Sequence, residues 1–158
     1  TLFPYTTLFR SLTIGREGVP ETASNAVLNA NYMMQQLKDI FPAAYDTVCM
    51  HEFVMSLEKM EHETGVSAMD IAKALLDHGI HPPTMYFPLI VHEALMVEPT
   101  ESESRETLDN AVDAFLKIAR MAKENPAHLH QSPHGCAISR PDEVKAARSP
   151  VLRYSFDS

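Results

Sequence analysis

The sequence predicts an α+β domain: a small, mostly antiparallel sheet with helices packed on one face. Two long stretches, residues 22–40 and 104–124, place apolar residues at three- and four-residue spacing, which is typical of amphipathic helices. Shorter apolar runs near residues 47–57, 84–87 and 90–98 are bounded by proline or glycine and predict strands. The five glycines form no GxGxxG or Walker A pattern, so the sequence predicts no phosphate-binding loop.

The first helix is predicted over residues 22–40 and ends at Phe41-Pro42. Three asparagines interrupt its polar side, although asparagine is unfavourable in a helix interior. They either contact polar groups of another domain or are solvated, and the sequence does not decide between these alternatives. The apolar face consists of Val27, Ala30, Met34, Leu37 and Ile40.

The first strand is predicted over residues 47–57, followed by a charged loop over residues 58–65. His51 and Glu52 lie inside this strand. They do not form the HExxH motif of zinc enzymes, because that motif needs two histidines four residues apart on a helix.

A second helix is predicted over residues 67–78, and its start is well defined. Ser67 as the N-cap and Asp70 three residues later form a capping box, and Val66 is placed to pack on Ile71. Gly79 can adopt the left-handed conformation that ends a helix.

Residues 77–104 organise the rest of the chain. Pro82 and Pro83 stiffen a loop that leads into the strands predicted over residues 84–87 and 90–98, the second of which is apolar enough to be covered on both faces. A stiff loop that holds His81, Thr84 and Tyr86 beside a buried strand is suited to form one wall of a site. The alternative is that the prolines only separate structural elements.

The third long helix is predicted over residues 104–124, with acidic residues at its start and basic residues at its end, as the helix dipole favours. Residues 125–158 contain four prolines and predict an irregular tail with one short helix over residues 141–148. A tail of this length has to be held by other parts of the protein or remain mobile. Residues 1–11 fit no pattern and are interpreted as a non-native artefact, expected to be poorly ordered.

Composition narrows the class of protein. With 13 basic and 21 acidic residues the net charge is −8, which argues against nucleic acid or an anionic membrane as a partner. Apolar residues make up 45% of the chain, enough for a core, and no apolar run is long enough to span a membrane. Cys49 and Cys136 are expected to be reduced thiols, so we expect a cytoplasmic location.

Two further readings of the C-terminal histidines are weak. His128, His130 and His134 lack ligands at a known zinc spacing, with Cys136 as the only additional candidate, so no metal site is predicted. Cys136 with His134 as its base would also need an orienting third group, which the sequence does not indicate.

Several long motifs carry a family resemblance that runs from about Ile14 to Tyr154. They are AVLNANYMM (26–34), MHEFVMSLE (50–58), DIAKALLDHG (70–79), HPPTMYFPLIVHEALMVEPTESES (81–104) and SPHGCAISRPDEVKAARSPVLRY (132–154). In this order they resemble the C-terminal region of glycine dehydrogenase (decarboxylating), the P-protein of the glycine cleavage system, and most closely subunit 2 of its two-subunit form. The stretch SPHGCAIS departs from the Thr-rich sequence usual in that family, which leaves the path of the tail open.

The resemblance implies a pyridoxal-phosphate enzyme of aspartate-aminotransferase-like fold (fold type I). Its cofactor is the electron sink for glycine decarboxylation, and the aminomethyl group passes to the lipoyl arm of the H-protein. Residues 12–124 then correspond to the small C-terminal domain and residues 125–158 to its tail. The family's cofactor lysine belongs to the large domain, and no lysine here has its sequence context (Lys38, Lys59, Lys73, Lys117, Lys123, Lys145). The cofactor is therefore expected on polypeptide outside this chain, and the chain alone is expected to be inactive.

The resemblance also selects four polar residues of the matching motif as candidates for one wall of the reaction cleft: His81, Thr84, Tyr86 and Glu98. Each has a structural alternative: His81 caps the preceding helix, Thr84 bonds its own loop, Tyr86 packs in the core, and Glu98 pairs with a helix N-terminus. The expected partners are glycine, subunit 1 of the enzyme and the lipoyl H-protein. The alternative function is a free-standing protein-interaction module without catalysis.

Overall fold

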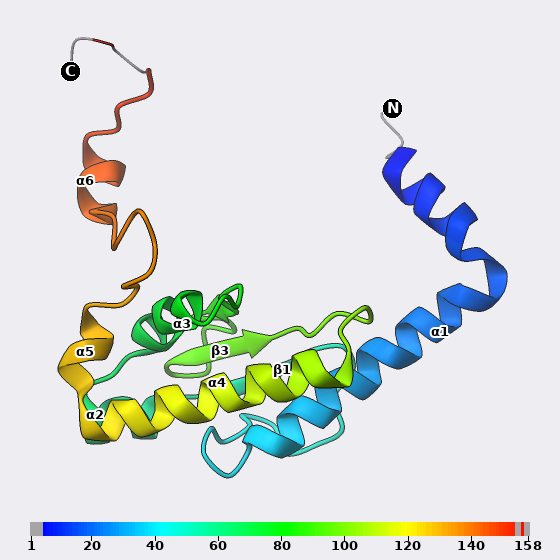
Figure 1. Ribbon diagram of the computed structural model, residues 1–158, viewed down its shortest axis with the longest axis horizontal. Coiled ribbons are helices and arrows are strands. Elements are labelled where there is room, and N and C mark those ends of the chain that lie inside the picture. Colours follow the sequence, from blue (N-terminus) through cyan, green and yellow to red (C-terminus); the bar gives the residue numbers. More distant parts are fainter. Residues whose placement is uncertain (1–4, 154–155, 157–158) are drawn as a thin grey trace.

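The computed structural model describes residues 5–153 and residue 156. It has an antiparallel three-stranded sheet of order β1-β3-β2, formed by β1 (Phe53–Ser56), β2 (Thr84–Met85) and β3 (Ala94–Val97). Three helices, α1 (Tyr5–Leu37), α3 (Ala68–Asp77) and α4 (Arg105–Glu124), contact one another or the sheet. The shorter helices are α2 (Glu58–Thr64), α5 (Pro126–His130) and α6 (Glu143–Arg148). The predicted α+β class with a small antiparallel sheet is confirmed (Figure 1).

One face of the sheet forms the core with the helices. In β1, Phe53 and Met55 are buried while the alternate residues are only half-buried. Phe53 pairs with Val97 and Met55 with Leu95, so the buried side chains of the two strands lie on the same face. Across from them, the Phe41 ring meets the edge of the Phe115 ring with centroids 5.7 Å apart. The aromatic pair joins the turn that follows α1 to the middle of α4.

The start of α3 has the predicted capping box. The Ser67 hydroxyl accepts a hydrogen bond from the Asp70 N–H, and the Asp70 carboxylate accepts one from the Ser67 N–H. Val66 and Ile71 are both fully buried beside this cap. Gly79 follows the helix with φ +71°, the left-handed conformation expected of it.

The strands are shorter than predicted. The run 47–57 contributes only Phe53–Ser56, because the backbone of Cys49 is bound by the Asn31 side chain of α1 instead of by a strand. The runs 84–87 and 90–98 contribute Thr84–Met85 and Ala94–Val97. Between them, Leu89 and Ile90 are 87% and 81% exposed, so the expectation of a strand covered on both faces is wrong for this part.

Two other expectations are corrected. Residues 58–65 are not a loop: they form α2, whose Met60 is buried and whose end is capped by Gly65 at φ +75°. A charged run with one apolar anchor makes a helix that lies on the surface with one side covered. Residues 5–11 continue α1, with a break at Gly15, whereas we expected residues 1–11 to be poorly ordered; residues 1–4 lie outside the described residues.

Two of the three asparagines of α1 bind segments of this same domain. The Asn29 amide donates to the carbonyls of Thr100 and Glu103, at 2.8 and 3.3 Å, and fixes the loop that follows β3. Asn31 exchanges hydrogen bonds with Cys49, as described above, while Asn25 is exposed. The polar side of this helix therefore organises the loops around the sheet.

In the part of the chain that the structure describes, no helix is long and apolar enough to cross a membrane. Cys49 and Cys136 are both free thiols.

Candidate cleft wall

A groove of about 600 Å³ lies between α4 and the end of the hairpin formed by β2 and β3. Its size is within the range of sites for small molecules. Its floor is apolar, with Met33 from α1, Val97 from β3, and Leu108 and Phe115 from α4. Its polar lining comes from both sides and comprises His78, His81, Thr84, Glu98, Thr100, Glu103, Thr107 and Asn110.

Three of the four predicted wall residues lie together in this groove. His81 and Thr84 come from the stiff loop and β2, and Glu98 follows β3 directly opposite. All three are exposed, and within residues 5–153 none of their side chains has a hydrogen-bond or ion-pair partner. These side chains are available to a ligand or to another polypeptide.

For two of these residues, His81 and Glu98, the structure differs from the structural alternative. The C-cap of α3 is formed by backbone N–H groups of the 78–80 turn, so His81 does not cap this helix. The N-terminus of α4 is capped by Ser104, whose hydroxyl accepts from the Thr107 N–H, so Glu98 does not pair with it.

Tyr86 lies away from the groove. It sits after β2 with φ +58°, close to the N-terminus of α3, and the residue is 40% exposed. Burial raises the pKa of the Tyr86 hydroxyl above its usual value, the Glu93 carboxylate raises it further, and Ser67 partly offsets both. The hydroxyl is therefore neutral at physiological pH and belongs to a different polar cluster.

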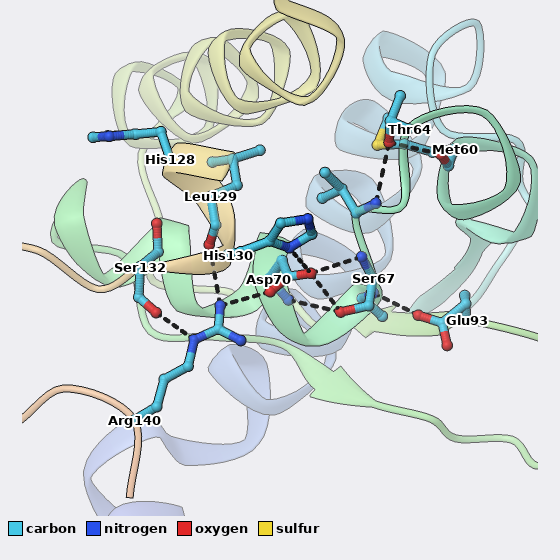
Figure 2. A network of polar contacts seen from close by, with 12 residues as sticks. Met60, Thr64, Ser67, Asp70, Glu93, His128, Leu129, His130, Ser132 and Arg140 are labelled. Carbon is cyan, nitrogen blue, oxygen red and sulfur yellow. Dashed lines mark hydrogen bonds and ion pairs between the residues drawn. The ribbon is translucent and has the colours of Figure 1, made fainter. Parts of the chain in front are cut away.

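That second cluster centres on Asp70 and was not foreseen from the sequence (Figure 2). Besides the capping box, the Asp70 carboxylate contacts His130 Nδ1 at 3.1 Å and Arg140 Nη2 at 2.6 Å. Arg140 also donates to the carbonyls of Ser132 and Leu129, at 2.7 and 3.1 Å. The Asp70 side chain is 6% exposed and the Arg140 side chain 33%, so this half-buried ion pair ties the tail to α3.

The pKa of Asp70 reflects opposing effects. Burial raises it, while hydrogen bonds from the backbone and side chain of Ser67 and the charge of Arg140 lower it. The lowering effects prevail, so the carboxylate is ionised at neutral pH. Only Ser67 could be assigned as a partner from sequence, because Arg140 is 70 residues away.

The C-terminal histidines have structural contacts. The rings of His128 and His134 stack with centroids 4.0 Å apart, and His134 Nε2 lies 3.0 Å from the His128 carbonyl. Among the described residues, no group of three or more His, Cys, Asp or Glu side chains is arranged to hold a metal ion.

Comparison with known proteins identifies the family. The family described as glycine dehydrogenase, C-terminal domain, matches residues 22–134, which is most of the chain. The chain belongs to this family. This match agrees with the resemblance that the sequence motifs indicated.

Curated relatives carry a name that agrees with the family match. The chain is 59% identical over 143 residues to a protein of Treponema denticola named probable glycine dehydrogenase (decarboxylating) subunit 2, covering 90% of this chain and 30% of the relative. A relative of the same name from Listeria innocua is 54% identical over 90% of this chain and 29% of its own length. Another, from Thermosipho africanus, is 50% identical over 92% of this chain and 30% of its own length. The chain therefore spans about 30% of the length of the curated relatives it matches and corresponds to their C-terminal part.

Proposed function

We propose that this chain is the C-terminal domain of subunit 2 of a glycine-decarboxylating enzyme, and that the groove is one wall of its reaction cleft. The observation that carries the proposal is the convergence of His81, Thr84 and Glu98, without internal partners, over an apolar floor. We place the enzyme in the cytoplasm. Family membership favours this function over a free-standing interaction module.

The described residues of the groove do not fit pyridoxal phosphate by themselves. No lysine or arginine is among the residues that line it, whereas Glu98 and Glu103 are. A carboxylate rim disfavours a phosphate group, and the cofactor needs a lysine amine to be held covalently. We therefore assign the cofactor to polypeptide outside this chain and derive no step of the reaction through it here.

The groove lining suits a ligand other than the cofactor. A groove with an apolar floor and a carboxylate rim favours a ligand that has an apolar stem and a cationic amine. The aminomethyl group carried on the lipoyl arm of an H-protein has this chemistry. In our proposal the chain contributes binding and orientation, and glycine decarboxylation requires subunit 1 and the remainder of subunit 2.

The test uses a chimera of the Treponema denticola relative in which this chain's aligned residues replace the corresponding region. Its activity is measured with subunit 1 and lipoyl H-protein as exchange of labelled bicarbonate into glycine. We expect an active chimera, and Glu98→Gln should lower kcat/KM by about tenfold, equivalent to about 1.4 kcal/mol of transition-state stabilisation.

The matched control is Glu61→Gln, the same change at an exposed residue of α2 far from the groove lining. Equal activity of the two variants would contradict the assigned role of the groove. An inactive chimera would contradict the proposed function as a whole.

A further inference from the structure

Part of the groove lining belongs to the loop that joins β3 to α4. This loop, residues 98–104, begins directly after β3 and ends at Ser104, the N-cap of α4. Glu98, Thr100 and Glu103 of the loop line the groove. The position of these groups at the rim therefore depends on what holds the backbone of the loop.

Asn29 of α1 holds this loop at two points. Its side-chain amide donates hydrogen bonds to the carbonyls of Thr100 and Glu103, at 2.8 and 3.3 Å. The Glu103 N–H donates to the same Thr100 carbonyl at 3.2 Å, so the two residues belong to one turn, here called the 100–103 turn. Asn29 is buried, with 9% of its surface exposed, and both protons of its amide nitrogen are used. One side chain thus fixes both ends of the turn.

Asn29 itself is not among the residues that line the groove. Met33, one helical turn further along the same face of α1, forms part of the groove floor, whereas Asn29 contacts the backbone of the loop. A residue in this position influences a ligand through the groups that it places at the rim. Asn29 is therefore suited to position groove residues rather than to contact the ligand.

Contacts between α1 and α4 make α1 a firm support for the loop. The Tyr32 hydroxyl donates a hydrogen bond to the Asp109 carboxylate, and the Arg105 guanidinium lies 5.8 Å from the centre of the Tyr32 ring. Both contacts are made in the first turns of α4, next to the end of the loop. Asn29, three residues before Tyr32, thus reaches the loop from a helix whose position relative to α4 is fixed.

We propose that Asn29 is a positioning residue of the groove: it holds the 100–103 turn so that the Glu103 carboxylate is placed at the rim to bind the cationic amine of the ligand. This inference rests on the proposed function, which assigns an amine on an apolar stem to the groove. A carboxylate on a fixed backbone loses less conformational freedom when it binds a cation than one on a loose loop. Removal of the Asn29 amide should therefore weaken binding of the amine without removing a group that contacts it.

The test uses the Treponema denticola chimera described above, with subunit 1 and H-protein whose lipoyl arm carries the aminomethyl group. The reaction is followed as synthesis of glycine from labelled bicarbonate. We expect Asn29→Ala to raise KM for the loaded H-protein at least about fivefold and to change kcat by less than about twofold, since uniform binding is lost.

The matched control is Asn31→Ala, the same change two residues further along α1. The Asn31 amide also donates to two carbonyls, those of Val27 and Cys49, but neither residue lines the groove. This variant likewise removes hydrogen bonds that stabilise the domain, and it should keep the KM of the unmodified chimera. The comparison separates a loss of stability from a loss of position at the groove.

Lipoyl H-protein without the aminomethyl group provides a second readout. It has the same arm without the amine, and it inhibits glycine synthesis by competing with the loaded form. Its inhibition constant should change by less than about twofold in Asn29→Ala, because the apolar floor of the groove is retained. A general loosening of the domain would instead raise both constants together.

Glu103→Gln tests the group through which Asn29 acts, and it remains informative if Asn29→Ala does not fold. The substitution leaves the backbone carbonyl of residue 103 in place as an acceptor for Asn29. We expect Glu103→Gln to raise KM for the loaded H-protein at least about fivefold. Asn29→Ala should add less than about twofold to this effect, because residues that act as a unit are not additive.

The proposal would be overturned by an unchanged KM in Asn29→Ala or Glu103→Gln, by an equal rise of KM in Asn31→Ala, or by an equal rise of the inhibition constant. Effects of Asn29→Ala and Glu103→Gln that multiply would also overturn it. Failure of the proposed function would instead appear as an inactive unmodified chimera, or as equal activity of Glu98→Gln and Glu61→Gln.

Discussion

The carboxylate of Asp70 accepts hydrogen bonds from Ser67 and Arg140 and contacts His130. It serves both the capping box of α3 and the contact with the tail. Removing the charge of one partner of this half-buried ion pair is costly, because the other charge keeps only its contacts with carbonyl groups and solvent. A single carboxylate thus couples the local stability of a helix to the path of a segment 70 residues away.

We predict that Asp70→Asn lowers the free energy of unfolding by about 2 kcal/mol, because the half-buried Arg140 loses its charged hydrogen-bond partner. The measurement is urea denaturation followed by circular dichroism. Asp113→Asn, at an exposed position of α4, should change stability by less than about 0.5 kcal/mol. Equal effects of the two substitutions would show that the Asp70 cluster does not stabilise the fold.

The pKa of Asp70 leads to a prediction about acid. Its folded-state pKa lies below the ordinary aspartate value of about 4, so its stabilising contribution is fully present above that value. The contribution is lost as the pH falls through the folded-state pKa. Arg140→Gln removes a lowering effect, so the pKa of Asp70 should rise and acid unfolding should begin at a higher pH. The measurement is circular dichroism during titration from pH 7 to about 2, with exposed Arg148→Gln as the control.

At the scale of elements, helices whose ends depend on local sequence match their predicted positions better than strands, whose lengths depend on distant partners. The start of α3 and the span of α4 depend on caps and on helical spacing, so local sequence was sufficient. Strand lengths depend on the partner strand, and β3 pairs over only four residues with β1 and two with β2. The predicted strands therefore extended into segments that have no partner.

In the candidate site, too, local sequence predicted some residues, whereas others come from distant parts of the chain. The motif around residues 81–98 selected His81, Thr84 and Glu98, which the structure brings into one groove. The same motif selected Tyr86 as a polar residue among apolar neighbours, but Tyr86 has a positive φ and is not among the residues that line the groove. The rest of the lining comes from α1 and α4, far away in sequence, and no spacing rule links these residues to the motif.

Gly79 allows a prediction at this scale. Its φ of +71° suits glycine, and a Cβ built there has no heavy atom within 4 Å. Gly79→Ala should therefore destabilise the domain through backbone strain alone, by about 1 kcal/mol. Gly79→Asn should cost less, because asparagine tolerates this conformation better.

Gly135 provides the comparison, since it is not among the described residues with positive φ. Its Cβ would meet the nearest atom, Asp77 Oδ1, at 3.4 Å. Urea denaturation of Gly135→Ala should show a smaller loss of stability than Gly79→Ala. The reverse order would indicate that the helix end is not strained by a side chain.

At the scale of the whole molecule, the domain has a core of its own, whereas the described lining of its groove contains no lysine or arginine. One apolar cluster joins α1, α3, α4 and the sheet, and the groove beside it has binding groups without a cationic residue in its described lining. Val144, Val151 and Leu152 of the tail, together with Leu89 and Ile90, add exposed apolar surface that the described residues do not cover. These features favour a domain that functions in contact with other polypeptides.

The absence of lysine from the described groove lining leads to a prediction about pyridoxal phosphate. The chain has six lysines, and none lines the groove; Lys117 lies on the exposed face of α4, beside a separate hollow. Mixed with pyridoxal phosphate and reduced with borohydride, the isolated chain should give only low, scattered labelling of surface lysines, seen by mass spectrometry. Free lysines react weakly because their amines are mostly protonated at neutral pH. A stoichiometric adduct at one lysine would contradict the assignment of the cofactor to polypeptide outside this chain, since it would require a lysine whose surroundings lower its pKa and orient it toward the cofactor.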